Sequence, residues 1–314
     1  MRAVTSNDGG AVVSIGTFDG VHLGHQRILA EVRRQADACG LEAVAYTFPI
    51  PPRRQLHEEP RRFLLLPETV KSRLLLDTVD RVVRAPFAEI RHLPPDRFVE
   101  RILAAELDAA SIVVGPSFRF GARRAGDPAA LRTLGAQHGF SVTVVPPVSV
   151  CGETVNSTRI RALVEEGDVE VAAALLGRPP VLIGEVASGD RVGHILGHPA
   201  ANLAVDPNVL LPDHGVYAAR VFVVGDPSPR PALLYVGARP TITTAPPALR
   251  CDVCLLDLPD AKLVRALIEV HLLERMREDR QFPSVDGLRR QIDRDVAQGR
   301  KTLARHPSST PIAG

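Results

Sequence analysis

The sequence lacks the features of secreted, membrane-spanning and nucleic-acid-binding proteins. Four cysteines in 314 residues are too few for a disulfide framework. No apolar run approaches the roughly 18 residues of a membrane helix, and the N-terminus shows no basic region followed by a long apolar stretch, so we expect no signal peptide. A formal net charge of +2 gives no reason to expect a nucleic-acid or membrane partner. We therefore predict a reduced, cytoplasmic protein.

Two of the cysteines, Cys251 and Cys254, have a spacing that also occurs in metal sites. No second pair of cysteines or histidines completes such a site. The surrounding sequence favours a strand, in which residues three apart point to opposite faces. We therefore expect no zinc at this pair.

The first half of the chain alternates apolar runs with helical periodicity, which predicts a parallel α/β sheet with right-handed crossovers. The length suffices for two domains. Helical periodicity covers residues 25–40 and 95–109. The predicted strands lie at 11–16, 42–48, 80–87, 111–118 and 140–148.

The first half ends with a capped helix, a glycine turn and another helix over residues 156–177. Beyond 178–180 short strands are broken by Gly, Pro and Asp, which predicts an antiparallel sheet or barrel. These strands lie at 181–190, 215–226, 231–242 and 249–258. We place domains at 1–180 and 181–305, with a disordered tail at 306–314.

A closing helix is predicted over residues 284–304, at the end of the second domain. Four apolar side chains recur at helical spacing within it and are expected to form its packing face. They are Val285, Leu288, Ile292 and Val296.

The segment Ser14–Val32, SIGTFDGVHLGHQRILAEV, joins a predicted strand to a predicted helix. Gly16 and Gly20 permit tight turns and a close approach of the backbone to a ligand. A helix beginning near His22 would point free N–H groups and the positive end of its dipole at phosphates. His25 follows about one turn later, so both imidazoles can face the same phosphate. The pattern favours phosphoryl or nucleotidyl transfer.

This segment, together with others, resembles the bacterial bifunctional riboflavin kinase/FAD synthetase family. Residues 113–127, VVGPSFRFGARRAGD, are similar to the family's second motif, and residues 156–179 are similar to its SSTxIR helix and the run after it. The similarity covers residues 11–304. The family's GxFDGxHxGHxxL pattern is matched by Gly16, Phe18, Asp19, Gly20, His22, Gly24, His25 and Leu29.

The resemblance implies a Rossmann-like nucleotidyltransferase domain followed by a riboflavin-kinase-like β-barrel. The implied reaction transfers AMP from ATP to FMN, giving FAD and pyrophosphate, with Mg²⁺ bridging phosphate oxygens. His22 and His25 would stabilise the α-phosphate in the transition state. The implied nucleotide-binding residues are Gly16, Phe18, Asp19, Gly24, Asn156, Ser157, Thr158, Arg159 and Arg161. The implied flavin-binding residues are Ser117, Phe118, Arg119, Phe120 and Asp127.

The transferase half departs from the family at two positions. The family's TFxPHP becomes TFPIPP at residues 47–52, with Pro51 in place of the histidine. Ser117 stands where the family commonly has Asp or Asn, and a hydroxyl can donate a hydrogen bond but carries no charge. These changes make the acceptor less certain than the reaction type.

The kinase half departs further. Val192, His194 and His198 replace two arginines and a phenylalanine of the family's GDxRGRxLGFPTAN pattern. Ala200 replaces its threonine, whereas Asn202, its other expected Mg²⁺–ATP ligand, is kept. An alanine methyl group cannot coordinate a hard cation.

The family's general base is a glutamate in a strand, and Asp252 stands at that position with Cys254 for the following histidine. The aspartate is one methylene shorter, and a general base must first be within reach of its proton. We expect riboflavin phosphorylation to be lost or weak.

Two alternatives to an FMN adenylyltransferase stay open. The first is a paralogue that transfers a nucleotidyl group to another phosphorylated acceptor or uses another nucleotide. The second is a non-catalytic flavin- or nucleotide-binding protein. The intact histidine pair argues against the second, because binding alone does not require it.

Overall fold

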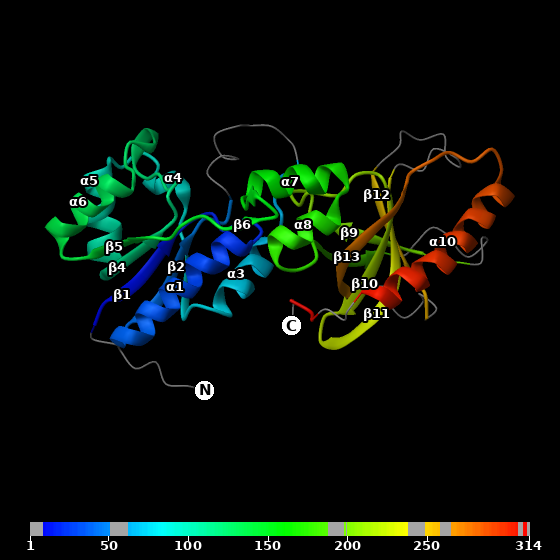
Figure 1. Cartoon of the computed structure of the whole chain (residues 1–314), viewed down its shortest axis with the longest axis horizontal. Coiled ribbons are helices and arrows are strands. Elements are labelled where there is room, and N and C mark those ends of the chain that lie inside the picture. Colours follow the sequence, from blue (N-terminus) through cyan, green and yellow to red (C-terminus); the bar gives the residue numbers. More distant parts are fainter. Residues whose placement is uncertain are drawn as a thin grey trace. The chain divides into compact units, whose positions relative to one another are not determined.

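The computed structural model describes residues 9–50, 62–187, 198, 200–237, 249–257, 265–306 and 310–312. The chain forms two compact units, drawn in Figure 1. The first unit contains residues 1–60 and 68–155, and the second contains 61–67 and 156–314. The chain thus passes between units at Val155 and Asn156, and the domain boundary near residue 180 stays a prediction.

The first unit is built on a parallel five-stranded sheet with the order β3-β2-β1-β4-β5. All five predicted strands are confirmed. They are β1 (Ala11–Ile15), β2 (Glu42–Thr47), β3 (Arg81–Arg84), β4 (Ala109–Val114) and β5 (Ser141–Val144).

Helices α1 (Leu23–Cys39) and α6 (Pro128–His138) form two of the crossovers between these strands. The predicted helix over 95–109 divides into α5 (Pro95–Phe98) and a π-helical segment, η1 (Val99–Glu106). Shorter elements complete the unit: α3 (Glu68–Leu76), α4 (Phe87–Ile90), η2 (Ala122–Arg124), β6 (Ser149–Val150) and β7 (Glu153–Thr154).

Strand alternation separates the two faces of this sheet. Val13 packs in one buried cluster with Phe98 and Leu103 from α5 and η1. On α1, the Gln35 side chain hydrogen-bonds the Ser111 hydroxyl of β4. The face of the sheet that carries Ser111 is therefore covered by α1, and the face that carries Val13 by α5 and η1.

The second unit starts with α7 (Ser157–Glu166) and α8 (Val169–Leu176), which confirms the predicted helix pair. Gly167 joins them at φ +80°, a conformation that glycine adopts readily. Residues 61–67 lie between β2 and α3 in sequence but belong to this unit, because Phe63 and Leu64 both donate backbone hydrogen bonds to the Asn208 carbonyl.

A closed antiparallel barrel of six strands follows, with the order β10-β11-β12-β9-β8-β13. The predicted barrel is confirmed, although the sequence pattern does not predict β9 or β13. The strands are β8 (Val181–Ala187), β9 (Ala201–Val205), β10 (Gly215–Val223), β11 (Asp226–Gly237), β12 (Arg250–Leu255) and β13 (Leu267–Glu278).

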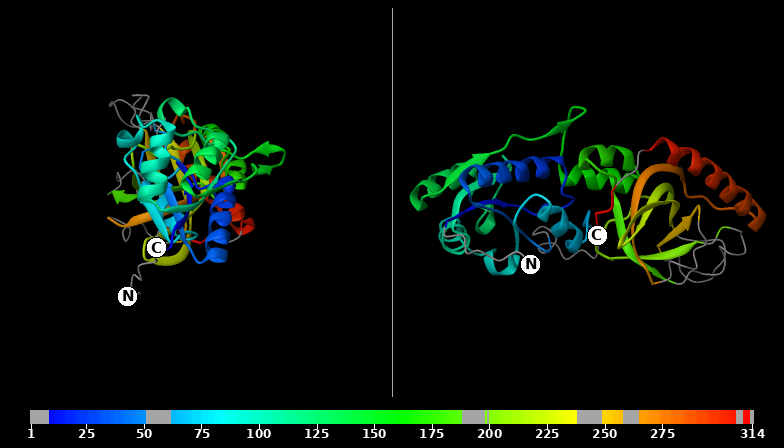
Figure 2. Two further views of the ribbon diagram at one scale, coloured as in Figure 1. Left: turned by 90° about the vertical axis from the view of Figure 1, so that its left-hand side faces the viewer. Right: turned by 90° about the horizontal axis from the view of Figure 1, so that it is seen from below.

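The closing helix is α10 (Val285–Arg305), which packs along the outside of the barrel against β10, β11 and β13 (Figure 2). Of the four apolar residues predicted to form its packing face, Leu288, Ile292 and Val296 are half-buried, whereas Val285 in the first turn is 53% exposed. The fully buried positions lie on the same side of the helix, three or four residues from these. They are Gln291, Asp295, Gly299, Thr302 and Leu303.

An ion pair joins this face of α10 to the barrel. The Arg277 guanidinium of β13 donates from Nη2 to Oδ2 of Asp295 over 2.8 Å. Gly299 lets the helix approach the barrel, since a Cβ there would lie 2.6 Å from Leu233 Cδ2. Helical periodicity of apolar residues does not reveal such a polar packing face.

Residue Ile312, within the predicted tail, lies against the barrel. Its N–H donates to both carboxylate oxygens of the fully buried Glu269, over 2.8 and 3.0 Å. Among the described residues, no helix is both long and apolar enough to cross a bilayer.

Candidate functional site

The loop between β1 and α1 has an unusual backbone. Phe18, Gly20 and Val21 all have positive φ, at +48°, +81° and +39°. Gly20 therefore supports a tight turn, as predicted. Gly16 has a different role: a Cβ at this position would lie 3.1 Å from the Phe18 ring, so the missing side chain lets the ring fold back over the loop.

His22 is the N-cap of α1. Its Nδ1 accepts a hydrogen bond from the backbone N–H of His25 over 3.3 Å. A neutral imidazole that accepts at Nδ1 carries its proton on Nε2. Gly24 leaves room for this arrangement, because a Cβ there would lie 3.1 Å from His22 Cε1.

The two imidazoles stack on each other. Their ring centroids are 3.6 Å apart with an interplanar angle of 16°, and the His25 ring also meets the Phe18 ring edge-on at 5.3 Å. His22 is only 6% exposed, whereas His25 is half-buried. Both rings lie in the first turn of α1, where unbonded N–H groups and the helix dipole favour an anion. The arrangement can bind a phosphate and stabilise charge that develops on it.

The end of β2 is tied to this loop. The Gly16 N–H donates to the Tyr46 carbonyl over 3.0 Å, and the Thr47 hydroxyl donates to the Thr17 carbonyl over 3.2 Å. Parallel strands present their carboxyl ends at one edge, where α/β proteins bind ligands. Pro51, which replaces the family's histidine, lies outside the described residues.

A buried lysine, which the sequence analysis does not identify, supports the same edge. Lys71 of α3 is 4% exposed and donates from Nζ to the Phe48 carbonyl over 2.6 Å. Its charge is paired with Glu68 Oε2 at 2.7 Å. The only signal for this pair in the sequence is its three-residue spacing on a helix.

The predicted flavin-binding segment contains exposed and buried residues. Ser117 and Arg119 are exposed, and Phe118 is half-buried. Phe120 is buried in the sheet core and stacks on Phe118 with centroids 5.7 Å apart. Gly126 lies against its ring, since a Cβ there would come within 2.5 Å of it. Phe120 therefore has a packing role whether or not it contacts a flavin.

Asp127 also has a structural role. It is the N-cap of α6, where its Oδ1 accepts a hydrogen bond from the Ala130 N–H over 2.8 Å. Flavin binding by this residue stays a prediction.

Asn156 is the N-cap of α7, and its Oδ1 accepts from the Arg159 N–H over 2.9 Å. Ser157 is half-buried and Thr158 is exposed. The preceding residue, Val155, ends the first unit beside α1: its carbonyl oxygen lies 3.6 Å from the position of a Cβ on Gly24. The predicted cap is present, and nucleotide binding by this helix start stays a prediction.

The two arginines of α7 have protein partners. Arg159 lies 4.0 Å from the Glu166 carboxylate. Arg161 donates from Nε to the Phe63 carbonyl over 3.0 Å, and its guanidinium carbon lies 3.9 Å from the centroid of the Phe63 ring. Arg161 therefore helps to hold Phe63 on the second unit, and nucleotide binding by Arg161 stays a prediction.

The barrel brings the two predicted kinase residues together. Asp252 of β12 lies opposite Asn202 of β9, and the amide Nδ2 donates to Oδ1 of the carboxylate over 3.4 Å. Asp252 is 5% exposed. Val192 and His194 lie outside the described residues, and His198 pairs with Asp293 at 2.7 Å.

A cavity of about 290 Å³ opens beside Asn202. Arg62 and Arg250 belong to its lining, and most of the surface it exposes is polar. Its lining residues are Arg62, Ala187, Asn202, Leu203, Val205, Leu211, Leu249, Arg250 and Cys251.

Cys251 and Cys254 both lie on β12, a strand, as predicted for this pair. Cys251 lies in the barrel core, and burial raises the pKa of its thiol to about 12. Cys254 is half-buried and its thiol approaches the Leu255 carbonyl. A buried neutral thiol is a poor metal ligand, because the metal binds the thiolate.

Residues 4–159 match the FAD synthetase family model, and residues 176–303 match the riboflavin kinase model. A bifunctional riboflavin kinase/FMN adenylyltransferase from Pseudomonas fluorescens is 34% identical over 305 residues, covering 94% of each chain. The chain belongs to this bifunctional family. The family's Escherichia coli K12 member is 32% identical over 296 residues, covering 93% of this chain and 92% of the relative.

The family fold also extends to a crystal structure described as a macrolide-efflux protein from Streptococcus pneumoniae. It has a TM-score of 0.84 and 28% sequence identity, and covers 94% of this chain and 95% of its own.

Proposed function

We propose that this family member transfers the adenylyl group of ATP to FMN, giving FAD and pyrophosphate. A phosphate oxygen of FMN attacks the α-phosphorus, and the bond to the bridging oxygen of the β-phosphate breaks. That oxygen leaves with the electron pair as part of pyrophosphate. Such a step depends on positioning and on charge stabilisation more than on covalent catalysis.

The observation that carries this proposal is the stacked histidine pair in the first turn of α1. Because Nδ1 of His22 accepts the capping hydrogen bond, the neutral ring carries its proton on Nε2, which would donate to the α-phosphate. His25 stacks against that ring and would donate to a second oxygen of the same phosphate. The N–H groups of the helix start would add to the positive potential.

The start of α7 is proposed to bind the leaving pyrophosphate. Ser157 and Thr158 offer hydroxyls, and the helix start offers N–H groups, in a segment that follows Val155 directly. Because Arg161 already stacks on Phe63, its role in this proposal is to orient the segment as well as to add charge.

Mg²⁺ is the proposed metal. Its chemistry would be to neutralise triphosphate oxygens and orient the phosphates. In the barrel, Asn202 and Asp252 lie side by side, with the amide nitrogen facing the carboxylate. Their side-chain oxygens are hard donors of the kind that suits this ion.

Riboflavin kinase activity is proposed to be weak or lost. Ala200 offers no ligand oxygen beside Asn202. Asp252 is both shorter than glutamate and already engaged by the Asn202 amide. The barrel core does not depend on either side chain, so the fold persists without the activity.

A second candidate is nucleotidyl transfer to another phosphorylated acceptor. It is supported by Ser117, which is exposed and uncharged at a position where the family commonly has Asp or Asn. A cytoplasmic location is proposed for either reaction. None of the four cysteines, all within the described residues, forms a disulfide, as a reducing compartment would give.

The deciding experiment incubates the purified full chain with ATP and Mg²⁺, and with either FMN or riboflavin. Mass spectrometry identifies the products. We expect FAD and pyrophosphate from FMN, and little FMN from riboflavin. FMN formation at an ordinary enzymatic rate would refute the loss of kinase activity. No FAD from FMN, with a product from another acceptor in a panel of phosphorylated compounds, would favour the second candidate.

A further inference from the structure

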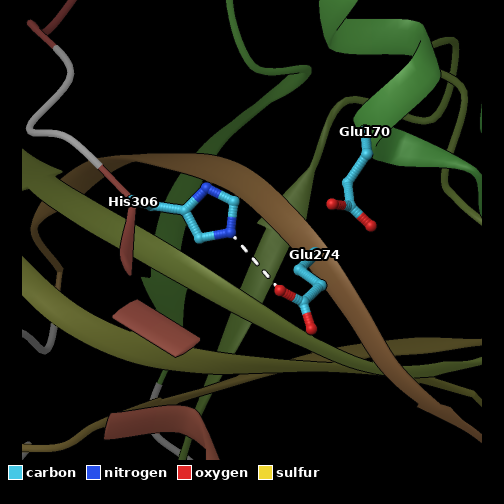
Figure 3. A group of neighbouring side chains, drawn as sticks. All are labelled: Glu170, Glu274 and His306. Carbon is cyan, nitrogen blue, oxygen red and sulfur yellow. Dashed lines mark hydrogen bonds and ion pairs between the residues drawn. The ribbon is translucent and has the colours of Figure 1, made fainter. Parts of the chain in front are cut away.

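Three metal-binding side chains gather on the second unit, and none of them belongs to the predicted transferase or kinase residues. Glu170 lies in the first turn of α8, Glu274 on β13, and His306 directly after α10. One potential ligand atom of each lies within 4.8 Å of the other two. Figure 3 shows the two carboxylates and the imidazole pointing toward one another.

The spacing of these atoms suits a shared ion better than a direct bond. His306 Nε2 is 3.4 Å from Glu274 Oε2, which is long compared with the roughly 2.7–2.9 Å of a charge-assisted hydrogen bond. Ligands of a tetrahedral zinc ion, with bonds of about 2.0–2.2 Å, lie about 3.3–3.6 Å apart. The exposed Glu170 side chain can adjust to complete such a geometry.

The scaffold holds two of the three groups in place. Glu274 stands opposite Ala218 in the register of β13 and β10. The backbone carbonyl of His306 accepts a hydrogen bond from Arg220 Nη2 over 2.7 Å, which fixes the chain at the end of α10. A site whose ligands come from three separate elements would link those elements when a metal binds.

We propose that Glu170, Glu274 and His306 bind one divalent ion of the Zn²⁺ type, with water as the fourth ligand. An imidazole with two carboxylates favours zinc and similar transition metals over Mg²⁺, which prefers oxygen ligands only. The ion clips α8 to β13 and to the C-terminal end of α10. Its role is structural, and it does not depend on the proposed adenylyl transfer.

Arg305 is the competitor for this site. Its Nη2 lies 3.3 Å from the same Glu274 Oε2 that faces His306, and its side chain is 64% exposed. The guanidinium can therefore swing into solvent when a metal binds. Removing its charge is expected to strengthen zinc binding, whereas removing a ligand weakens it.

The test uses the full chain, freed of metal with a chelator and then titrated with zinc chloride by calorimetry. We expect one equivalent to bind and to raise the thermal midpoint of the second unit, with no comparable shift from Mg²⁺. Glu274→Gln and His306→Gln should each weaken binding at least tenfold. Glu185→Gln, which removes an exposed carboxylate on β8, should leave it unchanged. Arg305→Gln should bind at least as tightly as the parent.

The proposal is overturned if the parent binds no zinc, or if Glu274→Gln and His306→Gln both bind with the parent's affinity. FAD formation from FMN in the same preparations serves as the folding control. It should be unaffected by the two ligand substitutions, so a failure of the zinc site and a failure of the transferase proposal can be told apart.

Discussion

The two units differ in whether their candidate site residues also stabilise the fold. In the first unit, His22 is at once a proposed donor to phosphate and the cap of α1. Gly24 and Gly16 leave the space that the His22 and Phe18 rings occupy. Losing any of these residues would disturb the helix start as well as the site.

In the second unit the two roles are separate. The barrel core contains Cys251 and Val253, while Asp252 between them points away from that core by strand alternation. Changes at Asp252 or Ala200 therefore leave the core packing intact. The comparison teaches that substitutions are tolerated least at a site whose side chains also stabilise the local backbone.

The largest expected effect comes from His25→Ala. Removing a preorganised donor to a developing phosphate charge should lower kcat for FAD formation by about 10²–10³-fold. His138→Ala removes an exposed histidine at the end of α6 and should leave kcat unchanged. Equal kcat values for the two variants in a steady-state assay would mean that the histidine pair is only structural.

The substitution Lys71→Met is expected to have a smaller effect, which concerns the stability of the fold. The Phe48 carbonyl loses a charged donor and Glu68 loses its buried partner, which should lower the free energy of unfolding by about 2 kcal/mol. Lys301→Met on the exposed side of α10 should change it very little. Chemical denaturation followed by circular dichroism measures both, and equal midpoints would contradict a supporting role for the buried pair.

The substitution Asp252→Glu tests whether the kinase site of the second unit can be restored without changing the fold. The added methylene restores the reach of a glutamate base, so FMN formation from riboflavin should rise about tenfold over the parent. FAD formation from FMN should not change. Asp252→Asn serves as the matched control, and equal FMN formation by the Glu and Asn variants would exclude residue 252 as the base.

The smallest effects are expected at two helix caps. Asn156→Ala and Asp127→Ala each remove one capping bond and should each cost about 1 kcal/mol of stability. If the start of α7 binds the triphosphate, only Asn156→Ala should also raise KM for ATP. Unchanged KM values in both variants would leave Asn156 with a capping role alone.

Much of the fold follows from local pattern. Strand and helix periodicity predicted all five strands of the sheet, and the capping residue and Gly167 predicted the α7–α8 pair. The apolar periodicity of α10 did not mark the polar residues of its packing face, because Asp295 is buried through its ion pair with Arg277. Lys71 was missed for the same reason: its partner carbonyl, on Phe48, is 23 residues away in sequence.

By itself, the sequence determined the alternation of strands and helices, the glycine-rich loop after β1 and the histidine that caps α1. These features depend on neighbours within a few residues, whose spacing is visible in the chain. Only the tertiary structure decided that Asn202 meets Asp252, that Arg161 stacks on Phe63, and that Glu170, Glu274 and His306 converge. Such contacts join residues far apart in sequence, and barrel register and helix packing, rather than local propensity, bring them together.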